Sequence, residues 1–98
     1  MRIMVDIDGC ICTDTKGKYE KAKPYPKRIA KINKLYDKGN FIIYWTARGA
    51  TTGIDWIDLT LKQFKEWGVK YHALDMNKPF YDLVIDDKGR RASEFFKK

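Results

Sequence analysis

Apolar residues occur along the chain in short continuous runs that alternate with stripes at helical spacing. The segment 2–6, with three apolar residues between Arg2 and Asp6, and the apolar run 41–45 each have the length of a buried strand, and the second is expected to be covered on both faces. Between them, a helix is predicted to follow Pro26 and to end before Gly39, a typical position for a glycine after a helix. Its inward stripe consists of Ile29, Ile32, Leu35 and Tyr36.

The second half of the chain continues the same alternation. Strands are predicted at 69–74 and 82–86, and a short terminal helix at 90–96. Polar residues predict a loop or small hairpin at 10–24 and a loop at 46–54. A second helical stripe, closed by Gly68, consists of Ile57, Leu61 and Phe64.

The predicted order is strand, helix, strand, helix, strand, loop, strand, helix. Helix–Gly–strand junctions at Gly39 and Gly68 are typical of βαβ units. We therefore expect an α/β fold with a parallel sheet and right-handed crossovers. In such a sheet, ligands bind beyond the carboxyl ends of the strands.

Length and composition limit the classes of protein that fit. With 98 residues, 44% of them hydrophobic, the chain is expected to form a single domain, residues 1–98, whose core needs no disulfide or structural metal. The apolar runs are too short to span a bilayer, and no signal peptide or membrane partner is predicted. Cys10 and Cys12 form C-x-C, which is no metal-ligand set and indicates packing residues in a reducing cytoplasm.

The chain is basic, with 20 Lys and Arg against 13 Asp and Glu and a formal net charge of +7. Such a charge suits nucleic acid, an anionic surface or a phosphorylated substrate. The lysines are spread out rather than packed in one block, which favours solvated helix and loop faces over an anion-attracting field. Nucleic acid is therefore a possible partner but not the favoured one.

Chemically useful side chains stand at the predicted carboxyl ends of the strands. An Asp-x-Asp pair ends the first strand, Thr-x-Arg the second and Asp-Asp the fourth, with Lys-Pro in the preceding loop. Because the carboxyl ends of parallel strands meet at one edge, these residues are expected to share one site. In chain order they are Asp6, Asp8, Thr46, Arg48, Lys78, Asp86 and Asp87.

Four carboxylates in one cleft need a cation, since one pair 4 Å apart costs about 4 kcal/mol at an effective dielectric constant near 20. Oxygen ligands without His or Cys suit Mg²⁺. A cation beside Thr46 and Lys78 describes a phosphate site, where one Asp can form an aspartyl-phosphate and the other can transfer protons. Each motif alone also fits a turn, a helix cap or a solvated lysine, so the prediction depends on their shared position.

Four short sequences, taken together, resemble the motifs of the haloacid dehalogenase (HAD) superfamily of phosphotransferases. They follow one another in the order of the family's motifs and extend over nearly the whole chain. They are residues 5–9, 43–48, 78–79 and 84–87. The resemblance implies a three-layer, Rossmann-like parallel sheet of strand order 4-1-2-3, with helices on both faces.

The resemblance also implies a role for each residue. Asp6 would be the nucleophile and Asp8 the general acid/base, while Thr46 and Lys78 would bind the phosphoryl group. The Mg²⁺ ligands would be Asp6, the backbone carbonyl of Asp8, Asp86 and, directly or through water, Asp87.

The chain departs from the family pattern because it has no room for a cap domain. Residues 10–24 suffice only for a hairpin flap, so the chain resembles small capless phosphatases, including those found with capsular-polysaccharide and sugar-nucleotide synthesis. Either the open cleft admits a large substrate, or the flap, the 48–53 loop or another subunit of a homo-oligomer closes it over a small ester. Arg48 is the candidate for a second substrate contact, because a guanidinium can hold phosphate or carboxylate in a bidentate way; a surface salt bridge is the alternative.

The sequence thus predicts a Mg²⁺-dependent phosphatase that hydrolyses a small sugar or metabolite phosphate through an aspartyl-phosphate. The alternatives are a phosphatase acting on a nucleic-acid end, a protein or a glycan, and a non-catalytic phosphate-binding module. A phosphoacceptor domain of the receiver type is disfavoured, because its acidic pair would follow the first strand rather than the last.

Overall fold

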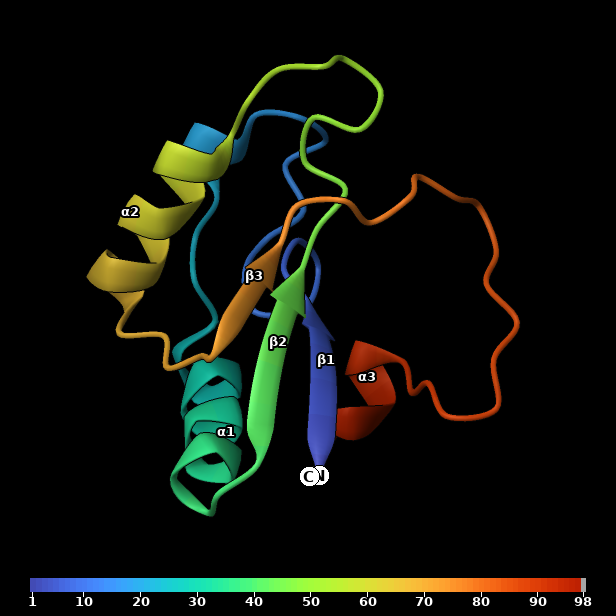
Figure 1. The fold of residues 1–98 in the computed structure, drawn as a ribbon. Helices are drawn as coiled ribbons and strands as arrows, with labels where there is room; N and C mark the ends of the chain where they lie inside the picture. The colour runs from blue at the N-terminus through green and yellow to red at the C-terminus, as the bar shows by residue number, and fades with distance from the viewer. Residues whose placement is uncertain (98) are drawn as a thin grey trace.

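The structure, a computed structural model, describes residues 1–97 and contains a parallel three-stranded sheet (Figure 1). Strand β1 (Arg2–Asp6) pairs with β2 (Phe41–Trp45), and β2 pairs with β3 (Ala73–Asp75). The bounds of β1 and β2 are those that the apolar runs predict. The α/β class and the parallel pairing are therefore confirmed.

Two helices form the crossovers between the strands, α1 (Pro26–Asp37) before β2 and α2 (Ile57–Trp67) before β3. Proline stands in the first turn of α1, where its missing N–H costs nothing. Gly68 ends α2 in the left-handed conformation at φ 69°, as the helix–Gly–strand pattern indicates. Among residues 1–97, no helix is long and apolar enough to cross a membrane.

Strand β3 is shorter than predicted and begins later, at Ala73 rather than Val69. Its ladder with β2 starts only at the pair Ile43–Ala73. The chain before β3 still bonds to the end of α2, because the N–H of Val69 donates to the carbonyl of Phe64. The apolar residues Val69 and Tyr71 belong to the core without being part of the strand.

The helices pack on one face of the sheet. Along β2, Ile42 and Tyr44 are fully buried, whereas Phe41 at the start of the strand is 42% exposed, and Met4 of β1 is 50% exposed. The core that covers the buried face includes side chains from α1 (Ile29, Ile32), α2 (Phe64) and the short α3 (Ala92–Phe95) with its neighbour Phe96. Within residues 1–97 the sheet therefore has one helical layer, and the predicted second layer, with β2 covered on both faces, is not observed.

Residues 10–24 form the small flap that their polar composition predicts. An isolated antiparallel bridge between Cys12 and Pro24 joins its two arms, and it contains the 3-10 turn η1 (Tyr19–Lys21). A hydrogen bond from the N–H of Tyr25 to the carbonyl of Ile11, 2.8 Å long, closes its base. Figure 1 shows the flap beyond the carboxyl ends of the strands, near the loop that follows β2.

The predicted fourth strand does not form in the described chain. Residues 82–86 carry no strand, and Leu83, Val84 and Ile85 are 73%, 60% and 91% exposed. Figure 1 shows this part of the chain as a wide loop between β3 and α3. An Asx turn, in which Asp86 accepts the N–H of Lys88 at 3.2 Å, competes here with extended pairing. The observed sheet order is therefore β1-β2-β3, and β1 is an edge strand.

Candidate functional site

A cavity of about 640 Å³ lies at the carboxyl ends of β1 and β2. The flap lines it with Asp14, Lys16 and Tyr19, and the segment after β3 lines it with Phe80 and Tyr81. The predicted site residues that line it are Asp6, Asp8, Thr46, Arg48 and Lys78. The parallel topology thus brings three of the sequence motifs to one place, as expected.

Asp6, the last residue of β1, forms an ion pair with Lys78. Its Oδ2 lies 3.1 Å from the Nζ of Lys78, and its Oδ1 accepts the N–H of Ile7 at 2.8 Å. The Lys78 side chain is 8% exposed, whereas that of Asp6 is 40% exposed. The Asp6 carboxylate therefore faces the cavity with a nearly buried ammonium beside it.

Lys78 is held as a cation by its surroundings. Its Nζ lies about 5 Å from the ring centres of Trp45 (5.1 Å) and Tyr81 (5.0 Å). Burial alone would lower the pKa of this ammonium, but the charge of Asp6 and the hydrogen bonds to Asp6 and Tyr81 together outweigh burial and raise the pKa above its ordinary value. A phosphate oxygen entering the cavity would meet a protonated lysine.

Thr46 connects β2, β3 and the Lys78 segment. Its N–H donates to the carbonyl of Asp75 at 3.0 Å, and its carbonyl accepts the N–H of Lys78 at 3.1 Å. The buried Oγ1 of Thr46 accepts the N–H of Arg48 at 3.0 Å, which leaves the hydroxyl proton to donate elsewhere. Backbone bonds therefore fix the positions of Thr46 and Lys78 relative to each other.

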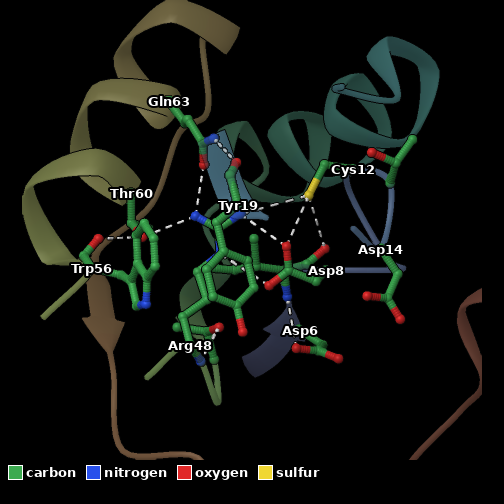
Figure 2. Close-up of polar contacts among 12 residues, drawn as sticks. Asp6, Asp8, Cys12, Asp14, Tyr19, Arg48, Trp56, Thr60 and Gln63 are labelled. Atoms are coloured by element: carbon green, nitrogen blue, oxygen red, sulfur yellow. Dashed lines mark hydrogen bonds and ion pairs between the residues drawn. The ribbon is translucent and has the colours of Figure 1, made fainter. Parts of the chain in front are cut away.

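Asp8 is clamped by Arg48 (Figure 2). The Nε of Arg48 donates to Asp8 Oδ2 and its Nη2 to Asp8 Oδ1, both at 2.9 Å, which is a bidentate arrangement. Arg48 is 3% exposed and the Asp8 side chain 15% exposed. The two charges thus neutralise each other in a mostly buried setting at the wall of the cavity.

The remaining donors of Arg48 are also used within the protein. Its Nη1 donates to Thr60 Oγ1 at 3.0 Å and to Gln63 Oε1 at 2.6 Å, and its guanidinium carbon lies 4.8 Å from the ring centre of Tyr19. Figure 2 shows the guanidinium between Asp8 on one side and α2 on the other. In the described conformation every nitrogen of the side chain has a protein partner, so the predicted substrate contact of Arg48 has no free donor. Its charge partner is a carboxylate at the wall of the cavity rather than one on the outer surface.

The inward face of α2 is only partly the predicted one, because Phe64 is buried as expected but the other two residues of the predicted stripe are not. Ile57 and Leu61 are 39% and 40% exposed, while Thr60 and Gln63 are buried beside Phe64. The reason is that the buried guanidinium needs hydrogen-bond acceptors, and α2 supplies them from two positions three residues apart on one face. Two polar residues at this spacing, one of them next to an apolar residue, are the signal in the sequence that could have indicated the inward face of α2.

The predicted metal ligands are only partly brought together. Asp6 and Asp8 line the cavity, whereas Asp86 and Asp87 are exposed and do not line it. Among residues 1–97, no group of three or more His, Cys, Asp or Glu side chains is placed to hold a metal ion. In this conformation the predicted donor set is therefore incomplete for Mg²⁺, because Asp86 and Asp87 lie away from the cavity and the Asp6 carboxylate already pairs with Lys78.

Cys12 packs under Asp8, as the packing role predicted for it requires. Its Sγ lies 3.6 Å from both the carbonyl of Ile7 and Asp8 Oδ1, and the residue is fully buried. Burial and, after it, the charge of Asp8 raise the pKa of the Cys12 thiol to about 12. The thiol is therefore an uncharged packing group at neutral pH.

Neither a family model nor a curated protein matches the chain. A crystal structure of a target protein from Vibrio cholerae is similar to this structure with a TM-score of 0.86. The two sequences are 22% identical, and the match covers 99% of this chain and 88% of that chain. At this level of identity the likeness concerns the fold, and it extends over the whole arrangement of sheet, helices and flap.

Proposed function

We propose that the protein is a phosphatase that hydrolyses a small phosphate monoester through an aspartyl-phosphate on Asp6. One observation carries the proposal. Asp6, Thr46 and Lys78 come from three separate segments and meet at one cavity, where a carboxylate, a hydroxyl and a buried ammonium lie together. The resemblance of the surrounding sequences to the HAD motifs supports the same chemistry.

In the first step, the carboxylate of Asp6 attacks phosphorus, and the bond between phosphorus and the leaving oxygen breaks. Lys78 and Thr46 hold the phosphoryl oxygens by a charge-assisted and a neutral hydrogen bond. The phosphate competes with Asp6 for the ammonium, which lies 3.1 Å away, and so frees a carboxylate oxygen for the attack. Asp8, when it carries a proton, donates it to the leaving oxygen.

In the second step, water attacks the aspartyl-phosphate. Asp8 takes a proton from the water, the bond between Asp6 and phosphorus breaks, and inorganic phosphate leaves. An ionised carboxylate has about four lone-pair sites, of which Arg48 uses two, so Asp8 can exchange a proton while it stays clamped. Asp8 ends the cycle in the protonation state in which it began.

The size of the cavity supports a small substrate. Its volume of about 640 Å³ is within the range of about 300–1,000 Å³ that small-molecule sites occupy. The flap narrows it on one side with Lys16 and Tyr19. If a polyanion were the substrate instead, a phosphorylated oligonucleotide would bind tightly, turn over faster than any sugar phosphate, and lose affinity steeply with salt.

The proposal includes Mg²⁺ and a strand order of 4-1-2-3, which need a rearrangement of residues 82–86. Within residues 1–97 the outer edge of β1 pairs with no strand, and the apolar side chains of 83–85 are exposed. An unpaired edge and an exposed apolar run favour pairing of the two. Such pairing would bring Asp86 to the carboxyl end of β1, next to Asp6. A titration of activity with Mg²⁺ tests this, because Asp86→Asn should then weaken apparent Mg²⁺ affinity more than Asp87→Asn; equal affinities contradict it.

Release of phosphate from p-nitrophenyl phosphate, with and without Mg²⁺, tests the function itself. We expect turnover by the wild type and none above background by Asp6→Asn. Asp14→Asn is the matched control, because Asp14 lines the same cavity and has no assigned role. A screen of sugar phosphates, phosphorylated metabolites and phosphorylated oligonucleotides then identifies the substrate. Absence of turnover throughout the screen, or full turnover by Asp6→Asn, would refute the proposal.

A further inference from the structure

We propose that Arg48 is a positioning residue that holds Asp8 in the orientation for proton transfer and couples this orientation to the flap. The kinetic part of this inference rests on the proposed function, whereas the structural coupling does not. Three observations support it: the bidentate clamp on Asp8, the burial of the guanidinium against α2, and the contact of its face with the flap.

The clamp fixes the plane of the Asp8 carboxylate. Two parallel N–H···O bonds of 2.9 Å hold both oxygens, so the carboxylate cannot rotate about its last bond without breaking one of them. A lysine in place of Arg48 would supply the charge but not the fork of donors. Orientation, and not charge alone, is therefore what this residue contributes to Asp8.

The guanidinium is itself fixed from the opposite side. Thr60 and Gln63 accept from the Nη1 of Arg48, and the residue is 3% exposed. The hydroxyl of Thr60 in turn donates to the carbonyl of Trp56 at 2.8 Å, one turn earlier on the helix. Through Arg48, the position of Asp8 is thus fixed relative to α2, a regular element of the fold, and not relative to a surface loop.

The flap contacts the free face of the same guanidinium through Tyr19. The ring of Tyr19 lies 4.8 Å from the guanidinium carbon and packs edge-on against Trp56, with 5.0 Å between ring centres. The carbonyl of Tyr19 also accepts from Gln63 Nε2 at 2.7 Å. A displacement of the flap would therefore loosen Arg48 and, through it, Asp8.

Kinetics of Arg48→Gln, alone and combined with Asp8→Asn, separate positioning from substrate contact. A positioning role predicts that Arg48→Gln lowers kcat for p-nitrophenyl phosphate at least tenfold and changes KM less than twofold. In the Asp8→Asn background, where turnover stalls after the first step, the same substitution should leave the rate of the burst unchanged. Arg48→Lys should behave like Arg48→Gln, because it lacks the fork. Lys62→Gln, a charge-removing change on the exposed side of α2, is the control and should leave kcat unchanged.

The flap is tested by Tyr19→Ala and Tyr19→Phe. Tyr19→Ala should lower kcat severalfold with little change in KM, and Tyr19→Phe, which keeps the ring over the guanidinium, should restore the wild-type value. Because these variants alter only a half-exposed side chain, they keep the test decisive even if both Arg48 variants fail to fold. Equal kcat for Tyr19→Ala and wild type would overturn the coupling to the flap.

Urea unfolding provides a readout that does not require activity. Arg48→Gln should lower the urea midpoint of unfolding more in the wild-type background than in the Asp8→Asn background, because Asp8→Asn has already broken the clamp. Additive midpoint losses would overturn the inference. A tenfold rise of KM in the otherwise wild-type chain, with an equal rise in the substrate concentration that half-saturates the burst of Asp8→Asn, would also overturn it and would make Arg48 a substrate contact. A wild-type chain without turnover would refute the proposed function, while non-additive midpoints would still support the structural coupling.

Discussion

The ion pair between Asp6 and Lys78 should respond asymmetrically to the loss of its two members. The Asp6 side chain is 40% exposed and can be hydrated without its partner, whereas the Lys78 side chain is 8% exposed and cannot. Removing the carboxylate therefore leaves a nearly buried cation without a counter-ion. Removing the ammonium leaves a carboxylate that water reaches.

The distance and the burial set the size of the effect. Two unit charges 3.1 Å apart attract with about 5 kcal/mol at an effective dielectric constant of 20, and desolvation of the lysine offsets most of this. We expect Asp6→Asn to lower the free energy of unfolding by about 1–3 kcal/mol. Lys78→Met, which keeps an apolar stem beside Trp45, should lower it by less than about 1 kcal/mol.

Urea unfolding at pH 7, followed by tryptophan fluorescence, measures these values for both single variants and the double variant. In the Lys78→Met background, the cost of Asp6→Asn should fall to below about 0.5 kcal/mol, because no buried cation is left unpaired. Asp14→Asn, which removes a carboxylate from the same cavity, is the control. Equal costs of the two single variants, or costs that simply add, would show that burial of Lys78 does not govern this pair.

The pH dependence of the same pair has a defined sign. The pKa of Lys78 is raised above the value of 10.5 that an unperturbed lysine has. A group whose pKa is raised by folding stabilises the protein fully below its unfolded pKa, and this contribution disappears as the pH rises through the folded value. The stability of the wild type should therefore fall relative to that of Lys78→Met only above about pH 10.5. A relative loss beginning near neutral pH would contradict the assigned shift.

Three further predictions concern the site and its supports. With p-nitrophenyl phosphate, Asp8→Asn should give a burst and then stall with phosphate on Asp6, whereas Asp6→Asn should give no burst. Mass spectrometry after acid quench detects the phosphorylated protein. Phosphorylation of Asp6→Asn alone would reverse the roles of the two residues. Cys12, whose pKa burial raises to about 12, should not react with Ellman's reagent at pH 8 until urea unfolds the chain, and rapid reaction in the folded state would place the thiol at the surface. Gly49→Ala should lower the unfolding midpoint, because φ is +85° and the added Cβ would lie 2.1 Å from the carbonyl oxygen of Ile54; an unchanged midpoint would mean that the loop moves freely.

The local pattern of the sequence determined β1, β2, the two crossover helices and the meeting of three motifs. Continuous apolar runs predicted β1 and β2 with their observed bounds, and Gly68 marked the end of α2. Asp6 and Thr46 could be placed together because the ends of parallel strands coincide, which follows from connectivity alone. Their proximity needs no knowledge of packing.

The partners of each side chain were decided only by the tertiary structure. Arg48 pairs with a residue 40 positions away and with Gln63, 15 positions away, and no local pattern records such distances. The side of α2 that faces inward was also decided by the tertiary structure, because the buried guanidinium selects Thr60 over the more apolar Leu61. Residues 82–86 have the composition of a strand, but a strand forms only if the fold places them beside a sheet edge. In this structure they do not pair with the open edge of β1. Hydrophobic periodicity reports burial from water, whereas the selection of polar partners depends on which segments the fold brings within hydrogen-bond distance.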